Sequence, residues 1–562
     1  MDNSKKFMKI DGMTVEINDE KNLLELIRKV GIKLPTFCYH SELSVYGACR
    51  MCMVEDQRGN LEAACSTIPA PGMDIKTNTE RLRKYRRNIL ELLLANHCRD
   101  CTVCANNGNC KLQELAVRFE IDNVRFPNTA AQPKIDDSSL CITRDANKCI
   151  LCGDCVRMCN EIQNVGAIDF AHRGSKMTIS CAFDRPIAES PCVGCGQCAA
   201  VCPTGAIIVR NDTSKVWKAL DDRNVKVTVQ IAPAVRVAIG KELWSKDGEN
   251  SMGRIVAALR RLGFDEIYDT STGADLTVLE ESKEFLEHIE HNESGLPLFT
   301  SCCPAWIQHC EKKYPELLPH VSSCRSPMEM LAAVIHEENK AHSRKHFHVA
   351  VMPCTAKKFE AERDEYKLDG KNPVDAVIST QELIKMIREA GIVFSELEPE
   401  AVDMPLGIAT GAGVIFGVTG GVTEAVLRRV STDKSRAAQS AIAYQGIRGM
   451  KGVKETTITY GDRTLRIAVV SGLKNTDDLI ERIKEGEHFD FVEVMACPGG
   501  CVSGAGQPYA SSEVRKRRGD GLYAADKMFG IKRSEENPLM YQLYDGILKD
   551  RVHELLHADY IK

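Results

Sequence analysis

The sequence predicts a multidomain protein that combines α+β and α/β architecture. The chain has 562 residues, which suggests roughly three to five domains of ordinary size. Groups of closely spaced cysteines occupy its N-terminal part. From about residue 215 onward, buried apolar runs such as "VKVTVQIAPAV", "HVAVMPC" and "LRIAVVSG" alternate with helical segments. Such alternation is typical of an α/β domain.

Composition and charge indicate an ordinary soluble protein. The formal net charge is −5, from 73 basic and 78 acidic residues, so the whole chain offers no reason to expect a nucleic-acid or membrane partner. The N-terminus lacks an apolar run of signal-peptide length, and nowhere do about 18 uncharged apolar residues follow one another. We therefore expect a cytoplasmic location.

The 25 cysteines are the unusual feature of the composition. In a small secreted domain they would indicate disulfides. This chain is large, lacks an export signal, and groups its cysteines at spacings of two and three residues. These spacings favour metal or iron–sulfur ligation.

Residues 1–80 are predicted to form a small β-rich domain. Alternating apolar positions ("MTVEIN") are followed by an amphipathic helix ("NLLELIRKVG") that ends at Gly31, and then by a cysteine-rich loop. The loop supplies C-x10-C-x2-C-x12-C, a set that suits a 2Fe-2S cluster, in which each iron needs two protein sulfurs. Zinc is the alternative, but the regular knuckle spacing is missing. The four candidate ligands are Cys38, Cys49, Cys52 and Cys65.

Residues 81–125 read as a helix, a cysteine loop and a second helix. The loop "HCRDCTVCANNGNC" contains H-x3-C-x2-C-x5-C, which could hold a 4Fe-4S cluster with one imidazole ligand. The ligands would be His97, Cys101, Cys104 and Cys110. Cys98 adjoins His97 and competes with it for the fourth position, and the spacing alone does not decide between them.

A Pro- and Asp-containing linker (126–139) precedes an internal repeat within residues 138–212. Both copies have the spacing C-x2-C-x2-C-x3-C, typical of bacterial two-cluster ferredoxins, in which the fourth cysteine ligates the other cluster. Structural zinc is strongly disfavoured here. We assign Cys149, Cys152, Cys155 and Cys202 to one 4Fe-4S cluster, and Cys192, Cys195, Cys198 and Cys159 to its neighbour.

Four such centres in succession would carry single electrons at low potential. Plant-type two-iron centres lie near about −400 mV. The proton/hydrogen couple lies at about −410 mV at neutral pH, from roughly 59 mV per pH unit. A low-potential reaction is thus compatible with this relay.

Residues 215–562 contain three further cysteine motifs, "TSCCPAW", "MPCTAKKFE" and "MACPGGCVSGAGQP". With these motifs in this order after four cluster patterns, the chain resembles the FeFe-hydrogenases, most closely the clostridial monomeric type with four accessory clusters. The resemblance covers essentially the whole chain. It implies a plant-ferredoxin-like β-grasp domain, a helical His/Cys-ligated cluster domain, a bacterial two-cluster ferredoxin domain and a large α/β catalytic domain.

The resemblance also implies how an H-cluster would be held. Cys303, Cys354, Cys497 and Cys501 would ligate a 4Fe-4S cubane, and Cys501 would also bridge to a two-iron unit with carbonyl, cyanide and azadithiolate ligands. Lys357 would pair with a cyanide. The remaining contacts would come from Ala232, Pro233, Ser326, Met328, Met352, Phe416 and Met495. Met328 stands where relatives often have a glutamine, and taken singly these apolar residues would be ordinary core.

A proton route is implied as well. Cys302 would exchange protons with the bridging amine, since a thiol titrates near enough to neutrality. Glu281, Glu284 and His288 share one helix face at i, i+3 and i+7, and Ser322 would join the two carboxylates. The family usually has an arginine where this chain has His288. Without the resemblance, two glutamates on a helix would be a solvated face.

The expected function is reversible formation of H2 from protons and electrons, with ferredoxin as electron partner and dedicated maturation enzymes supplying the two-iron unit. Two alternatives remain: an electron-transfer subunit of an NADH or formate dehydrogenase complex, and a hydrogen sensor or iron–sulfur assembly factor. Intact "TSCCP" and Lys357 argue against both alternatives. The sequence shows no dinucleotide fingerprint, so direct reduction of NAD would require a partner. Five cysteines have no role and are expected to be buried structural thiols: Cys98, Cys141, Cys181, Cys310 and Cys324.

Overall fold

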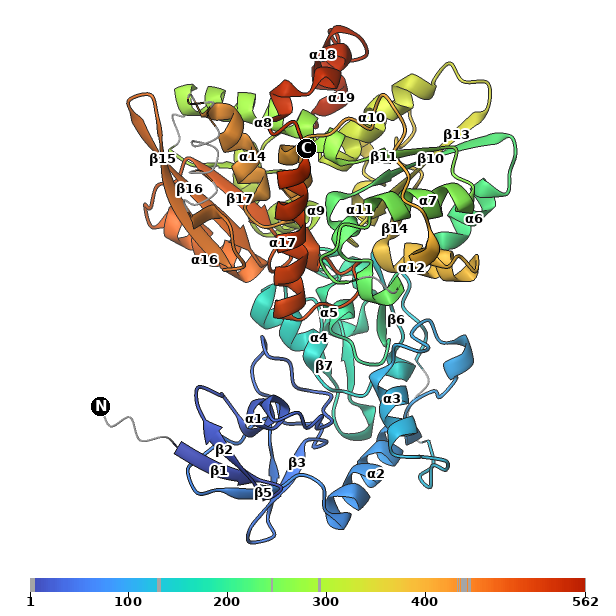
Figure 1. Ribbon diagram of the computed structural model, residues 1–562, viewed down its shortest axis with the longest axis vertical. Helices are drawn as coiled ribbons and strands as arrows, with labels where there is room; N and C mark the ends of the chain where they lie inside the picture. Colours follow the sequence, from blue (N-terminus) through green and yellow to red (C-terminus); the bar gives the residue numbers. More distant parts are fainter. Residues whose placement is uncertain are drawn as a thin grey trace.

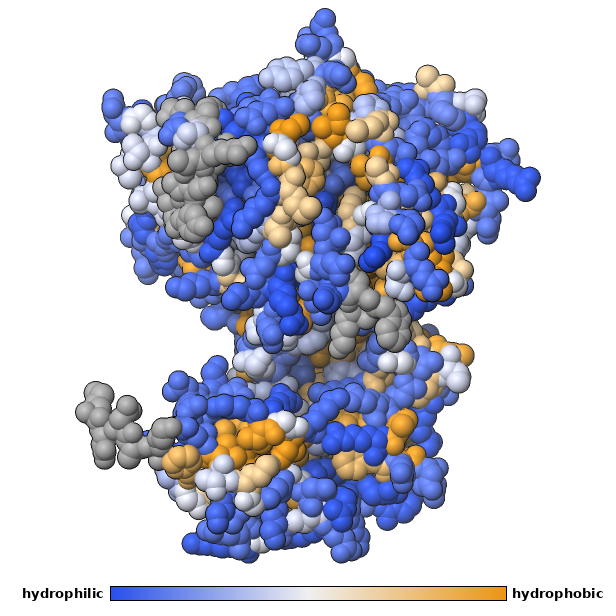
Figure 2. Space-filling model, viewed as in Figure 1, coloured by the Kyte–Doolittle hydropathy of each residue, from blue (hydrophilic) through white to orange (hydrophobic). Residues whose placement is uncertain are grey.

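The computed structural model describes residues 6–128, 133–243, 246–291, 295–431, 433, 435, 442 and 446–560. Part of the predicted linker, residues 129–132, lies outside them. Within the described chain no helix is both long enough and apolar enough to span a bilayer. Figure 1 shows the N-terminal domains below, the large C-terminal half above, and the segment with α4 and α5 between them. Hydrophilic residues cover most of the visible face, with smaller apolar areas over both parts (Figure 2).

The N-terminal domain is a mixed five-stranded sheet in the order β2-β1-β5-β3-β4. Strand β1 pairs antiparallel with β2 and parallel with β5. Helix α1 (Leu23–Lys29) begins where the Asn22 side chain accepts a hydrogen bond from the backbone of Glu25, and it buries its leucines in the domain core. The strands are β1 (Lys6–Ile10), β2 (Met13–Ile17), β3 (Met53–Asp56), β4 (Leu61–Ala63) and β5 (Asp74–Lys76).

Two short domains follow. In the first, α2 (Glu80–Ala95) and α3 (Lys111–Arg118) flank a cysteine loop, and Thr79 caps α2. In the second, the outer strands β6 and β9 pair antiparallel, so the two cysteine runs between them fold back on each other. Its elements are β6 (Ile142–Arg144), α4 (Asp154–Arg157), a π-helical turn (Met158–Ile162), β7 (Asp169–Ala171), β8 (Thr178–Ser180), α5 (Gln197–Ala200) and β9 (Ile207–Val209).

The C-terminal half contains two four-stranded sheets. In the order β11-β10-β13-β14 every pairing is parallel. In the order β12-β17-β16-β15 only the β15–β16 hairpin is antiparallel. The strands are β10 (Val225–Ile231), β11 (Glu266–Asp269), β12 (Leu298–Phe299), β13 (Lys345–Met352), β14 (Ala376–Ser379), β15 (Val453–Tyr460), β16 (Arg463–Ser471) and β17 (Phe491–Met495).

Helices cover both sheets, which explains why their strands read as continuous apolar runs. The helix predicted for "ADLTVLEESKEFLEHIE" forms as α8 and carries Glu281, Glu284 and His288. The helices are α6 (Thr213–Leu220), α7 (Met252–Leu262), α8 (Ser271–His291), α9 (Pro304–Lys313), α10 (Pro327–Asn339), α11 (Lys357–Glu360), α12 (Thr380–Glu389), α13 (Gly411–Val414), α14 (Gly421–Val430), α16 (Leu473–Lys484), α17 (Ser512–Met528), α18 (Pro538–Asp545) and α19 (Val552–Leu556).

The two sheets direct their carboxyl ends toward one place. Ala232 directly follows β10, Cys354 comes two residues after β13, and Cys497 comes two residues after β17. The pair Cys302–Cys303 follows β12. Ligand sites of parallel sheets form outside the carboxyl ends of the strands. Here loops from both sheets line one shared cavity.

Candidate functional site

The cysteines of the N-terminal domain gather at one end of its sheet. The Cys49 amide donates to Cys38 Sγ at 3.4 Å, and the Phe37 amide donates to Cys49 Sγ at 3.4 Å. Cys52 and Cys65 are both buried at 1 % exposure. Backbone N–H groups directed at the sulfurs favour thiolates, the form that ligates iron.

In the helical cysteine loop, His97, Cys101 and Cys110 line one hollow. His97 is buried, and its Nδ1 atom has no hydrogen-bond partner within the described residues. A buried ring nitrogen without a partner is costly unless something else binds it. This orphan nitrogen is chemically suited to ligate a metal and supports His97 as the fourth ligand of the set.

The repeated cysteine runs cross over. Cys149, Cys152, Cys155 and the distant Cys202 line one cavity. Cys159 lies near Cys192, Cys195 and Cys198. Burial raises the pKa values of Cys195 and Cys198, and the neighbouring thiols, which include Cys159, raise them further. The structure thus brings the eight cysteines together in the two groups that the repeat predicts.

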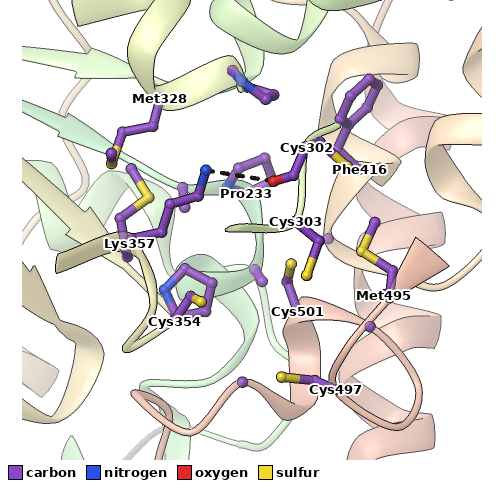
Figure 3. Close-up of a pocket in the computed structure, with 18 of the residues that line it drawn as sticks. Pro233, Cys302, Cys303, Met328, Cys354, Lys357, Phe416, Met495, Cys497 and Cys501 are labelled. Atoms are coloured by element: carbon purple, nitrogen blue, oxygen red, sulfur yellow. Dashed lines mark hydrogen bonds between the residues drawn. The ribbon is translucent and has the colours of Figure 1, made fainter. Parts of the chain in front are cut away.

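The cavity between the two sheets has an almost wholly apolar lining. Four cysteines from three separate segments of the chain line this cavity. In Figure 3 Cys302 lies beside Phe416, above the group that these four cysteines form. Met328 and Met352 belong to the apolar core around β10 and β13, whereas Phe416 and Met495 belong to the core around α14 and β17. The four cysteines are Cys303, Cys354, Cys497 and Cys501.

A glycine next to Cys501 allows two backbone segments to pack closely. Gly500 has φ +90°, and a Cβ there would lie 2.5 Å from the Thr419 backbone nitrogen. Only glycine satisfies both conditions. The chain beside Cys501 can therefore pack closely on the backbone of residues 418–419, and the four thiols with the apolar walls fit a cubane with an attached two-iron unit.

Lys357 is the cation in the lining. It is 8 % exposed, and its Nζ donates to Glu360 Oε2 at 2.6 Å and to the Cys302 carbonyl at 3.5 Å (Figure 3). Burial alone would lower the pKa of Lys357, but Glu360 and the neighbouring anions raise it on balance. The ammonium is therefore charged and faces an apolar cavity, where it would attract an anionic ligand.

One predicted cavity residue lies elsewhere. Ser326 does not line the cavity: its hydroxyl donates to Glu360 at 3.0 Å and accepts the Glu329 amide at the start of α10. Ser326 is connected to the cavity indirectly, because Glu360 also accepts a hydrogen bond from the cavity residue Lys357. Ala232, Pro233, Met328, Met352, Phe416 and Met495 do line it.

Behind Cys302 lies a column of polar side chains. Glu281 is fully buried, and burial raises its pKa to about 8, although interactions with the Ser301 backbone and the Ser322 hydroxyl lower it in part. Burial, and next the charge of Glu281, raises the pKa of the Cys302 thiol. The Ser322 hydroxyl donates to Glu284 Oε2 at 2.5 Å. A proton-carrying carboxyl therefore stands between the cavity and Glu284.

The outer end of this column differs from the expectation. The His288 imidazole Nε2 lies 2.9 Å from the Leu296 carbonyl. Glu284 instead contacts Ser323 and His557, a residue of the C-terminal segment. Sequence reasoning missed His557 because nothing local links residue 557 to residue 284.

Four of the five unassigned cysteines are buried as predicted, whereas Cys98 is only half-buried. Cys141 lies in the core of the two-cluster domain, where a Cβ on Gly194 would meet its sulfur at 2.5 Å.

The fold and the site define an iron–sulfur redox protein with a buried cavity lined by cysteines. The chain belongs to the iron-only hydrogenase family and is an oxidoreductase acting on H2. The profile "Iron only hydrogenase large subunit, C-terminal domain" matches residues 225–505, and "Iron hydrogenase small subunit" matches 512–562. Upstream, three profiles match: a 2Fe-2S cluster binding domain (7–80), the NADH-ubiquinone oxidoreductase-G iron-sulfur binding region (86–125) and a 4Fe-4S dicluster domain (148–206).

Relatives extend over the whole chain. The NADP-reducing hydrogenase subunit HndD of Solidesulfovibrio fructosivorans is 40% identical over 98% of both chains. Iron hydrogenase 1 of Clostridium pasteurianum is 34% identical, covering 98% of this chain and 99% of its own. Among solved structures, the FeFe-hydrogenase HydA(deltaEFG) is 38% identical with a TM-score of 0.53, over 63% of this chain and 99% of its own. The predicted family, cofactor classes and mixed multidomain fold are thus confirmed.

Proposed function

We propose that this protein interconverts two protons and two electrons with H2, and that it exchanges the electrons with ferredoxin or a similar low-potential carrier. The observation that carries the proposal is one buried cavity lined by four cysteine thiols and a charged lysine, with the proton-bearing carboxyl of Glu281 close to Cys302 in its wall. An H-cluster bound there supplies the redox chemistry. Residues 215–562 would form this catalytic domain, and the location would be cytoplasmic.

Each residue has a proposed task. Cys303, Cys354, Cys497 and Cys501 hold the cubane. Lys357 holds an anionic ligand of the two-iron unit, while the apolar wall excludes water, which strengthens that attraction. The wall comprises Ala232, Pro233, Met328, Met352, Phe416 and Met495, and Ser326 fixes Glu360 behind Lys357.

Protons would move between Cys302 Sγ and Glu281, then through Ser322 to Glu284. Because the pKa of Glu281 is raised to about 8, its carboxyl both holds and releases a proton near neutral pH. Interactions with the backbone of Ser301, next to Cys302, and with the Ser322 hydroxyl place this carboxyl between the two groups that it would connect.

Electrons would enter through the N-terminal centres. We propose 2Fe-2S ligation within residues 1–80, 4Fe-4S ligation by one histidine and three cysteines within 81–125, and two 4Fe-4S clusters within 138–212. Gln197 supports contact between the last centre and the cavity, because its Nε2 donates to Cys497 Sγ at 3.1 Å across the domain boundary.

A second electron partner has support from similarity. HndD is described as a subunit of an NADP-reducing hydrogenase and matches 98% of this chain. Assembly with a nucleotide-binding partner subunit is therefore the alternative to free ferredoxin. Copurification of such a subunit, and H2-dependent NADP reduction by the complex alone, would favour it.

The deciding experiment is reconstitution of the purified chain with the two-iron unit, which dedicated maturation enzymes would supply in the cell. Wild type should evolve H2 from reduced methyl viologen. Cys302→Ala should lose most turnover and keep its infrared carbonyl and cyanide bands, because the cluster ligands are untouched. Equal turnover in both proteins would remove the proton route, and an inactive wild type with normal bands would remove the enzymatic proposal.

A further inference from the structure

The C-terminal segment places an imidazole against the acidic face of α8. His557, just after α19, is 9 % exposed. Its Nδ1 lies 2.7 Å from the Ser323 hydroxyl and 3.4 Å from Glu284 Oε1, and its Nε2 lies 3.3 Å from Glu280 Oε2. A single side chain therefore joins the end of the proposed proton column to a second carboxylate.

Ser323 is the bridge between His557 and Glu284. Its hydroxyl donates to Glu284 Oε1 in a short contact, and its amide donates to the same oxygen at 3.2 Å. Since that hydroxyl proton is directed at Glu284, the Nδ1–H of His557 must be the donor to Ser323 Oγ. The order of donors thus points inward, from imidazole to hydroxyl to carboxylate.

From His557 the contacts continue to the surface. The His557 ring stacks on the exposed His553 ring, with centroids 5.1 Å apart and planes 13° apart. Glu280 accepts a hydrogen bond from the half-buried Tyr544 hydroxyl. His288, which sequence reasoning placed at the outer end, bonds to the Leu296 carbonyl.

Building on the proposed route through Cys302, Glu281, Ser322 and Glu284, we propose that His557 is the relay residue that connects Glu284 with solvent. The route would run from the surface beside His553 through His557 and Ser323 to Glu284. It would make the C-terminal segment part of the proton machinery.

The transfer step balances as a double hop. The Nδ1–H bond of the His557 imidazolium breaks as an O–H bond forms on Ser323, while the Ser323 O–H bond breaks as one forms on Glu284. An imidazolium and a carboxylate become an imidazole and a carboxylic acid. One proton from solvent then restores the imidazolium, so one proton enters for each that moves inward, and H2 oxidation runs the same hops in reverse.

The charges around His557 suit this role. Burial alone would lower its pKa, but the bonds to Glu280 and Glu284 raise it to about 9. Burial alone would raise the pKa values of the Glu280 and Glu284 carboxyls. Their hydrogen bonds, of which the one to His557 has the largest effect, lower these pKa values on balance. The groups facing the site are Glu280, Lys283 and Glu284 from α8, Ser323, Cys324 and Arg325 before α10, Tyr544 from α18 and His553 from α19.

The test compares His557→Gln, His557→Ala and His288→Gln in the full chain carrying all its clusters. At pH 7 to 8 we expect His557→Gln to evolve H2 at least about tenfold more slowly than wild type, within the range of a lost acid–base group. His288→Gln should lose less. Added imidazole should restore turnover to His557→Ala, and the alkaline fall of turnover near pH 9 should be absent from His557→Gln.

A structural role would produce neither the rescue nor the altered pH profile. Ser323→Ala removes the bridging hydroxyl without touching the C-terminal segment, and it should slow turnover similarly. If His557→Gln fails to fold, normal turnover in Ser323→Ala overturns the proposal. So does a greater loss in His288→Gln than in His557→Gln. Loss of turnover in Cys302→Ala together with normal His557→Gln refutes this exit alone, whereas a fully active Cys302→Ala refutes the proposed route itself.

Discussion

The N-terminal relay and the catalytic half hold their cysteines in opposite ways. In the N-terminal part most members of each set come from one short loop, the exceptions being Cys65, which follows the β3–β4 hairpin, and the exchanged fourth cysteines Cys159 and Cys202, and several thiols are half-buried. In the catalytic half the thiols arrive from the ends of β12, β13 and β17 and enclose a buried cavity. Local sets can form and exchange electrons near the surface, whereas a dispersed set exists only once both sheets have folded.

The largest expected effect contrasts one cysteine from each region. Cys501→Ser should abolish H2 turnover and the infrared bands of the two-iron unit, because we propose Cys501 as the link between its two parts. Cys104→Ser should retain most viologen-driven turnover and lose much of the ferredoxin-driven turnover. Parallel assays with both donors check this. Full ferredoxin-driven turnover in Cys104→Ser would show that electrons enter elsewhere.

Next in size is the proton column. Glu281→Gln should reduce turnover by about 10²–10⁴-fold, the usual cost of removing a positioned acid–base group. The reconstituted variant and Glu281→Asp, which retains a titrating carboxyl, can be assayed side by side for H2 evolution. An active Glu281→Gln protein would exclude this carboxyl from the route.

Glu281 also predicts a pH dependence of stability. Its pKa is near 4.5 in the unfolded chain and about 8 in the folded protein, so between these values the unfolded state binds fewer protons and stability falls as pH rises. Glu281→Gln should remove this fall and be relatively more stable at pH 8 to 9. Denaturant midpoints from pH 5 to 9 would reveal it, and parallel curves for wild type and variant would contradict it.

The Lys357–Glu360 pair tests how strongly the cavity depends on buried charge. Lys357→Met should destabilise the catalytic half by about 3–5 kcal/mol, because it strands the carboxylate of Glu360, which is 1 % exposed. The double variant Lys357→Met with Glu360→Gln should recover most of that stability without recovering activity. Urea unfolding of the three proteins measures it. A double variant no more stable than Lys357→Met would mean that the lysine acts by packing.

The smallest effect belongs to the relay surface. Lys33 and Glu114 form a 3.0 Å ion pair with side chains 82 % and 53 % exposed. Lys33→Ala should change unfolding stability by less than about 1 kcal/mol, since solvent and salt screen such pairs. A larger change would mean that contacts between α3 and the first domain matter more than charge. Unfolding at two salt concentrations distinguishes the charge interaction, which depends on salt, from the packing contacts.

Much of the molecule could be predicted from the sequence because its signals are local. Spacing grouped the N-terminal thiols, periodicity located α8 and the buried strands, and three motifs located the four thiols that line the cavity. The position of the Ser326 side chain could not be predicted from the motifs. Its neighbour Pro327 lines the cavity, whereas the Ser326 hydroxyl donates to Glu360. The spacing likewise left His97 and Cys98 open, and the unpartnered Nδ1 atom of His97, which supports the histidine, became visible only in the tertiary structure.

The sequence by itself determined which chemistry the protein carries, because ligand types and their spacing are covalent properties of the chain. Only the tertiary structure decided how the buried polar groups connect. His557 lies 273 positions from Glu284 in the numbering and yet 3.4 Å from it in space. The partners of a buried charge are chosen by packing and desolvation across the whole fold, and no local pattern records them.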